Sequence, residues 1–161
     1  MHKLRFISVI LFNFALACAP AIAASDSGVL KISSAFAPEA PPVAPVMAGY
    51  LTLGNPGSKP ITITASHSKA FRKVEIHRMK MENGMMHMER QPTLEIPAHS
   101  KVRLEPGGYH LMLIGPKKHL QAGDKIAVVL EFKSGKRQSI SLPVIKPDTG
   151  AKAKHHHSMQ D

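Results

Sequence analysis

Short runs of strand-forming residues, separated by turn residues, recur along this 161-residue chain and constrain its fold more than any other feature. Turns at intervals of roughly 8–12 residues are typical of β-sandwiches and barrels. No stretch carries the apolar period of an amphipathic helix over three turns. The pattern therefore predicts an all-β sandwich or barrel. We expect strands at residues 29–36, 46–53, 61–65, 71–81, 85–91, 93–96, 101–104, 110–114, 125–132 and 138–144.

The dipeptide Asn83-Gly84 is the strongest hairpin signal in the chain, because a two-residue turn of type I′ favours Asn followed by Gly. If these two residues form the loop, Met79 lies opposite Met88. His77 and Met88 are then diagonal neighbours on one face, within reach of long side chains. The same register places further thioethers on that face, from Met79, Met81 and Met86.

The remaining methionines and histidines of the hairpin are interpreted as surface or packing residues. Met85 and His87 fall on the opposite face of the hairpin, and His87 and His99 are interpreted as surface histidines. Methionine in a β protein is most often a packing residue. We therefore assign a packing role, or at most a weak secondary role, to Met79, Met81, Met85 and Met86.

Two histidines and two methionines stand out by their joint spacing, which is His77-x10-Met88-x21-His110-x-Met112. His110 and Met112 are two apart in an expected strand, so they share a face. The Gly-Gly pair before His110 permits backbone angles that present this histidine at the lip of the sheet. Soft thioether sulfur selects Cu(I) over hard cations, and imidazole is compatible with copper. The set predicts a protein that holds copper.

Several other classes of function fit the sequence poorly. A blue-copper electron carrier needs a cysteine thiolate, and the only cysteine is Cys18, near the N-terminus. No nucleophile–base constellation is visible, and we expect no enzymatic activity. The formal net charge is +10, but no dense Lys/Arg block with interleaved aromatics suggests a nucleic-acid partner. The basic balance leaves open an acidic protein partner or simply a soluble basic surface.

The N-terminal segment has the pattern of a signal peptide. A basic start and an apolar run precede Ala21-Ile22-Ala23, which offers the small-x-small pattern of a signal peptidase site. We expect residues 1–23 to be removed after export to the periplasm, leaving no stable membrane insertion. Lipoprotein processing at Cys18 is a minor alternative, because the residues before it form a poor lipobox.

The chain changes character again near its C-terminus. Residues 24–145 are expected to form the copper-binding domain, whereas 146–161 are polar and are expected to form a flexible tail. The tail carries a secondary candidate metal site, which suits Cu(II) because imidazole dominates it. Its donors are His155, His156, His157 and Met159. A purification tag is the alternative, although three histidines followed by Ser-Met-Gln-Asp fit a tag poorly.

The chain resembles the periplasmic copper(I) chaperones called PCuAC, whose signature His-x10-Met-x21-His-x-Met is met at every position. The resemblance extends to the residues at 48–57, 74–77, 104–113 and 123–132, and it covers about residues 28–145. It implies a cupredoxin-like, Greek-key β-sandwich or barrel. It also implies one Cu(I) site made by His77, Met88, His110 and Met112.

The resemblance further implies a role in supplying copper to cytochrome oxidase assembly. The expected recipients are Sco-type thiol proteins or the copper subunit of the oxidase. A copper-sequestering resistance protein with no delivery role is the alternative, since it would need the same site.

Overall fold

A computed structural model describes residues 29–147, which form a 10-stranded sheet. No helix able to span a membrane occurs among these described residues. The expected strands are all present, with ends that differ by a few residues. The strands are β1 (Lys31–Pro38), β2 (Val46–Asn55), β3 (Ile61–His67), β4 (Phe71–Glu82), β5 (Met85–Gln91), β6 (Leu94–Ile96), β7 (Ser100–Leu104), β8 (Tyr109–Pro116), β9 (Lys125–Phe132) and β10 (Arg137–Ile145).

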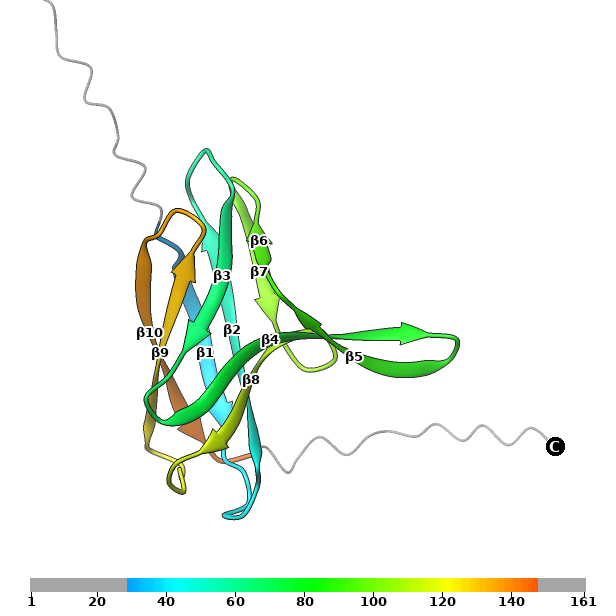
Figure 1. The fold of residues 1–161 in the computed structure, drawn as a ribbon, viewed down its shortest axis with the longest axis vertical. Coiled ribbons are helices and arrows are strands. Elements are labelled where there is room, and N and C mark those ends of the chain that lie inside the picture. The colour runs from blue at the N-terminus through cyan, green and yellow to red at the C-terminus, as the bar shows by residue number, and fades with distance from the viewer. Residues whose placement is uncertain (1–28, 148–161) are drawn as a thin grey trace, which may run out of the picture.

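The sheet closes on itself into a barrel (Figure 1). The strand order is β5-β4-β8-β7-β2-β1-β10-β9-β3-β6, and an additional β3–β4 pairing joins Ser66 to Val74. The Ser66 hydroxyl also donates to the Val74 carbonyl oxygen at 3.1 Å. Most pairings are antiparallel, but β1 runs parallel to β10. The all-β, cupredoxin-like fold class predicted from the sequence is confirmed.

β1 differs from its expected span because its register shifts between Ser33 and Phe36. Ser34 adopts a positive φ of 51° at this irregularity. The bulge lets the strand continue to Pro38, two residues beyond the expected end, where Ala37 pairs with Val144 of β10. The site strands are not affected.

The core fills the inside of the barrel with one set of side chains from every strand except β5, which has no buried residue. In β9 and β10 the buried residues alternate with exposed or partly exposed ones, as expected when one face of a strand is covered. In β8 the inward side chains are Leu111 and Leu113, so that His110 and Met112 stand on the outer face. Gly49 of β2 allows this packing, because a Cβ there would lie 3.3 Å from Leu111 and Leu142.

The β4–β5 hairpin extends away from the barrel wall (Figure 1). Its loop is Asn83-Gly84, and both residues have positive φ, 51° and 76°, as a type I′ turn requires. Met79 pairs with Met88 and His77 pairs with Arg90. The register predicted from the Asn-Gly signal is therefore confirmed.

Candidate metal centre

The two motif histidines lie side by side on β4 and β8, where His77 and His110 are direct cross-strand partners. Their ring centroids are 6.0 Å apart with an interplanar angle of 39°. A metal–imidazole bond is about 2 Å long, so this separation leaves room for one ion between two ring nitrogens. Both rings are largely buried, with exposed fractions of 12% for the His77 side chain and 8% for His110.

The orientation of the His77 ring is set by Glu75, which precedes it on the same face of β4. The ring Nε2 lies 2.9 Å from Glu75 Oε2. An ionised carboxylate can only accept, so the proton of the neutral ring is on Nε2 and the lone pair is on Nδ1. That Nδ1 is buried and has no hydrogen-bond partner. A buried nitrogen lone pair without a partner is costly unless a ligand satisfies it, and a soft metal ion fits.

Glu75 itself is nearly buried, and three cationic or hydrogen-bonding side chains hold it. Lys73 Nζ lies 2.7 Å and Arg90 Nε 2.9 Å from Glu75 Oε1, whereas His77 takes Oε2. Hydrogen bonds from Lys73 and then from His77 lower the pKa of the Glu75 carboxyl, against the raising effect of burial. The carboxylate therefore stays ionised and keeps the His77 ring in one tautomer. Arg90 belongs to β5, so this ion pair also ties the base of the hairpin to the barrel.

His110 is positioned by the turn that enters β8. The Gly108 amide donates to the Glu105 carbonyl oxygen at 3.0 Å, and Gly107 takes a φ of +80° within this turn. A positive φ at the third residue of a turn is the conformation that glycine adopts without steric cost. The His110 Nδ1 lies 3.3 Å from the Gly108 carbonyl oxygen, which can only accept. Donation from Nδ1 leaves Nε2 of His110 as the nitrogen able to bind a metal.

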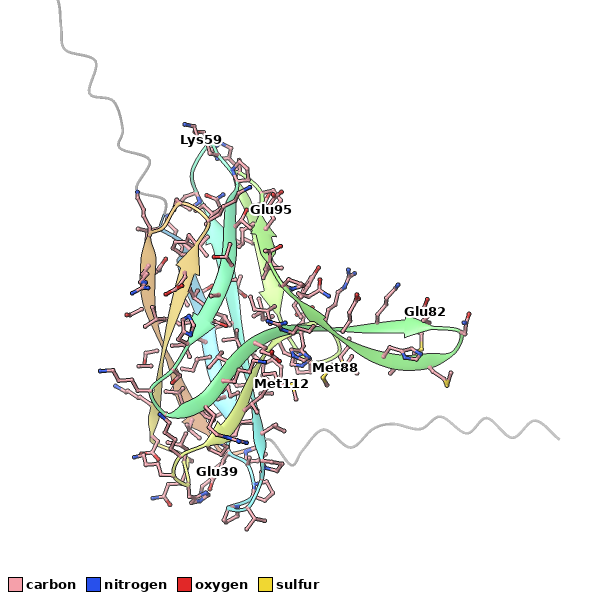
Figure 2. The ribbon with its side chains drawn as sticks, viewed as in Figure 1. Glu39, Lys59, Glu82, Met88, Glu95 and Met112 are labelled. Atoms are coloured by element: carbon pink, nitrogen blue, oxygen red, sulfur yellow. The ribbon has the colours of Figure 1, made fainter. Side chains whose placement is uncertain are left out.

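The two motif methionines flank the histidine pair from opposite directions. Met112 is half-buried two residues beyond His110 on the same face, opposite Glu75. Met88 lies one strand further out on β5, and its side chain is 52% exposed. Figure 2 shows Met88 near the base of the hairpin, and Met112 on β8 close to where the hairpin leaves the barrel. The strand pairing thus preassembles two histidines and one methionine, while Met88 approaches from the projecting hairpin.

The sequence predicts a packing role, or at most a weak secondary role, for the other hairpin methionines, and the packing role is wrong for three of the four. Met81 and Met85 are each 62% exposed and Met86 is 49% exposed, because the hairpin leaves the barrel before these positions. Met79 is half-buried. The sequence period correctly gives the face on which each side chain lies, but it cannot show whether that face is covered. His87 and His99 are exposed, as expected of surface histidines.

Glu75 and its partners are not among the site residues predicted from the sequence. The signal was present, because Glu75 lies two residues before His77 in an expected strand and so shares its face. The predicted register, with Met79 opposite Met88, also implies that Arg90 lies opposite His77, on the face that Glu75 shares. The expected leader 1–23, Cys18 and the tail donors at 155–159 lie outside the described residues.

Two comparisons of sequence bear on the family. Residues 30–144 match the model of the LpqE-like family, described as "Putative lipoprotein LpqE-like". The chain is 36% identical over 98 residues to the protein named "Putative lipoprotein Lxx21020" of Leifsonia xyli subsp. xyli. That alignment covers 60% of this chain and 59% of the relative, so the chain matches well under two thirds of the relative's length.

Solved structures share the fold. The copper-bound PCuAC domain from PmoF2 superposes with a TM-score of 0.62 at 22% identity, covering 73% of this chain and 93% of that domain. The solution structure of CuI-DR1885 from Deinococcus radiodurans gives a TM-score of 0.60 at 27% identity, covering 78% of this chain and 87% of that protein. The family match extends over most of the chain, and these neighbours agree with it in fold. The protein therefore belongs to the LpqE-like family, and its barrel is that of the PCuAC copper chaperone domains.

Proposed function

We propose that this protein is a copper chaperone that binds Cu(I) through His77, His110, Met112 and Met88. The observation that carries the proposal is the cross-strand pair of His77 and His110, with the buried Nδ1 of His77 left without a partner. Two imidazoles and two thioethers make a soft donor set, which suits Cu(I). The copper-bound state of the PmoF2 domain and the CuI form of DR1885 support copper as the cargo.

The division of the ligands between barrel and hairpin suits a carrier. His77, His110 and Met112 stand on strands of the closed barrel, so they can hold the ion without reorganising the fold. Met88 is half-exposed on an edge strand, where a recipient's donor atom can replace it. A copper ion leaving such a site would exchange one ligand at a time, beginning with the most exposed thioether.

Replacing both site methionines by leucine tests the ligand set. We expect the variant Met88→Leu/Met112→Leu to fold normally and to lose tight Cu(I) binding in an anaerobic titration against a competing chelator. Met85→Leu is the matched control, because Met85 is also exposed on the hairpin but lies on its other face. Unchanged Cu(I) affinity in the double variant would overturn the proposed site.

The recipient is proposed to be the assembly machinery of cytochrome oxidase, either a Sco-type thiol protein or the copper subunit of the oxidase. Mixing the Cu(I)-loaded protein with each recipient and separating the two should move the metal to the recipient. Retention of copper by this protein, at equilibrium and with either recipient, would favour the sequestering role instead.

The protein is proposed to act in the cell envelope after export. The family description and the name of the Leifsonia relative both refer to lipoproteins. Mass spectrometry of the protein from membranes and periplasm would separate cleavage after Ala23 from lipidation at Cys18.

The tail is proposed to supply a weaker Cu(II) site through His155, His156, His157 and Met159. A ligand tethered by a short flexible linker can reach an effective concentration in the millimolar range, so a weak site can still matter. Deleting residues 146–161 should remove Cu(II) binding and leave Cu(I) binding at the barrel. Unchanged Cu(II) stoichiometry after deletion would exclude a metal-binding role for the tail.

A further inference from the structure

The face of the hairpin that bears Met88 continues outward as a double row of methionines. Met79 of β4 lies directly opposite Met88 of β5, and the next pair on the same face is Met81 with Met86. Beyond this second pair the chain turns at Asn83-Gly84. The outer half of this face therefore presents only thioethers, and it lies beyond the His77–His110 pair along the hairpin.

Packing does not account for these side chains. Met81 is 62% and Met86 is 49% exposed, on a hairpin that projects from the barrel (Figures 1 and 2). Fully burying a methionine contributes about 1.5–3 kcal/mol, and roughly half of that contribution is forgone at each of these two positions. β5 is also an edge strand, where exposed apolar residues favour unwanted association and charged residues are the usual protection. Met81 and Met86 are thus a cost to the fold without a matching benefit in packing.

The geometry suits one soft metal ion. Directly opposed side chains on one face of an antiparallel pair have Cβ atoms about 4.5–5.5 Å apart, and diagonal neighbours lie about 7–8 Å apart. Methionine has a long, flexible side chain with a polarisable sulfur, so sulfurs from neighbouring positions can converge on one ion. Charged groups of the outer hairpin such as Lys80 and Glu82 lie on the opposite face, where Lys80 Nζ is 4.0 Å from Glu82 Oε2. A thioether face without carboxylates selects a soft monovalent ion over hard cations.

We propose that Met79, Met81 and Met86 form a second Cu(I) site on the hairpin, weaker than the barrel site and separate from it. The barrel site has two imidazoles that are already oriented, whereas the hairpin site has only thioethers on an exposed ribbon. The hairpin site therefore binds Cu(I) less tightly and exchanges it with solvent-borne ligands more readily.

The test uses the full chain, labelled with ¹³C at the methionine methyl groups, and titrated anaerobically with Cu(I) alone. The first equivalent should shift the methyl signals of Met88 and Met112. Further Cu(I) should shift those of Met79, Met81 and Met86 and leave Met85 unchanged. If the signals of Met81 and Met86 do not move in excess Cu(I), or Met85 moves as far as they do, the hairpin site does not exist and the row has another use, such as contact with a protein.

Variants separate this site from the barrel site. Met81→Leu/Met86→Leu should weaken hairpin binding at least tenfold without changing the first equivalent, because both positions are exposed and distant from the core. Met85→Leu should retain both binding events. His110→Ala should weaken the first equivalent while the shifts of Met81 and Met86 persist. Loss of both events in the leucine pair would mean that there is one shared site, and persistence of both in that pair would also overturn the proposal. Unchanged first-equivalent affinity in His110→Ala would instead count against the barrel site alone.

Discussion

The two halves of β4 form one continuous strand in two different settings. In the first half Phe71, Val74 and Ile76 are buried in the barrel, and Glu75 is nearly buried beside them. In the second half the strand leaves the barrel, and its side chains from Lys80 to Glu82 are exposed. His77 stands at the boundary between these settings. Under the proposed function the two halves have separate tasks: the barrel half stabilises the fold, and the hairpin half would supply donor atoms that a second molecule can reach.

The two halves of β4 should respond differently to substitution. Substitutions in the barrel half are expected to change the free energy of unfolding, whereas substitutions on the exposed ribbon should change metal binding with little effect on unfolding. The residues at the boundary, His77 and Glu75, are expected to change both. Four experiments test this contrast, from the largest effect to the smallest.

Leu113→Ala should destabilise the barrel most. Leu113 is fully buried between the outward-facing Met112 and Ile114. Truncating a buried leucine leaves a cavity and costs about 2–5 kcal/mol of unfolding free energy. Met85→Ala on the hairpin should change that free energy by less than about 0.5 kcal/mol. Chemical denaturation of the copper-free protein measures both, and comparable losses would show that the hairpin is part of the barrel's cooperative unit.

Moving a thioether to the other face of the hairpin should disrupt the proposed copper site without changing the fold. The variant His87→Met/Met88→Thr places the thioether one residue away, on the face opposite His77. We expect Cu(I) affinity to fall roughly 100-fold, equivalent to about 2.7 kcal/mol, while the free energy of unfolding is unchanged. His87→Met alone is the control and should bind as the wild type does. Wild-type affinity in the double variant would show that proximity, rather than the face, is what matters.

Glu75→Gln should weaken Cu(I) binding about 10–100-fold, the range typical for partners that orient a metal-binding histidine. The amide cannot accept from Lys73, Arg90 and His77 as the carboxylate does, so the His77 tautomer is no longer fixed. Glu89→Gln is the matched control, since Glu89 is exposed on the same hairpin. Equal affinity in both variants would assign Glu75 to folding alone.

Gly107→Ala should have the smallest of these effects, about 1 kcal/mol of unfolding free energy. Gly107 has a φ of +80°, where a Cβ is strained although the surrounding space is open. Gly108→Ala is the control, because a Cβ there would meet Glu105 at 3.5 Å, an ordinary contact. Denaturation curves of the two variants should differ in this order, and a greater loss in the Gly108 variant would contradict the turn geometry.

Much of the fold could be predicted because its signals are local. Each strand is marked by its own turn residues, and Asn83-Gly84 fixes the hairpin register without reference to the rest of the chain. The closure of the barrel could not be predicted in the same way. It depends on pairings such as Ser66 with Val74 and Ala37 with Val144, which no local pattern specifies.

The candidate site likewise has features that local sequence determines and features that depend on long-range strand pairing. The faces of His77, Met88, His110 and Met112 follow from strand period and turn type, both of which are local. The direct opposition of His77 and His110 depends on the β4–β8 pairing, and it came from the structure. The exposure of Met81 and Met86 depends on where the hairpin leaves the barrel, which hydrophobic periodicity does not encode.

The carbonyl oxygen of Gly108 connects the two regions through a single atom. It accepts the Met79 amide at 3.0 Å, at the root of the hairpin, and it also lies 3.3 Å from Nδ1 of His110. The tilt of the hairpin and the rotation of the imidazole are therefore mechanically linked. A force that bends the hairpin and draws Met79 away would change the hydrogen bond between the Gly108 carbonyl oxygen and the His110 ring. At the proposed copper site, the affinity for the ion would then depend in part on the angle of a hairpin that extends into solvent.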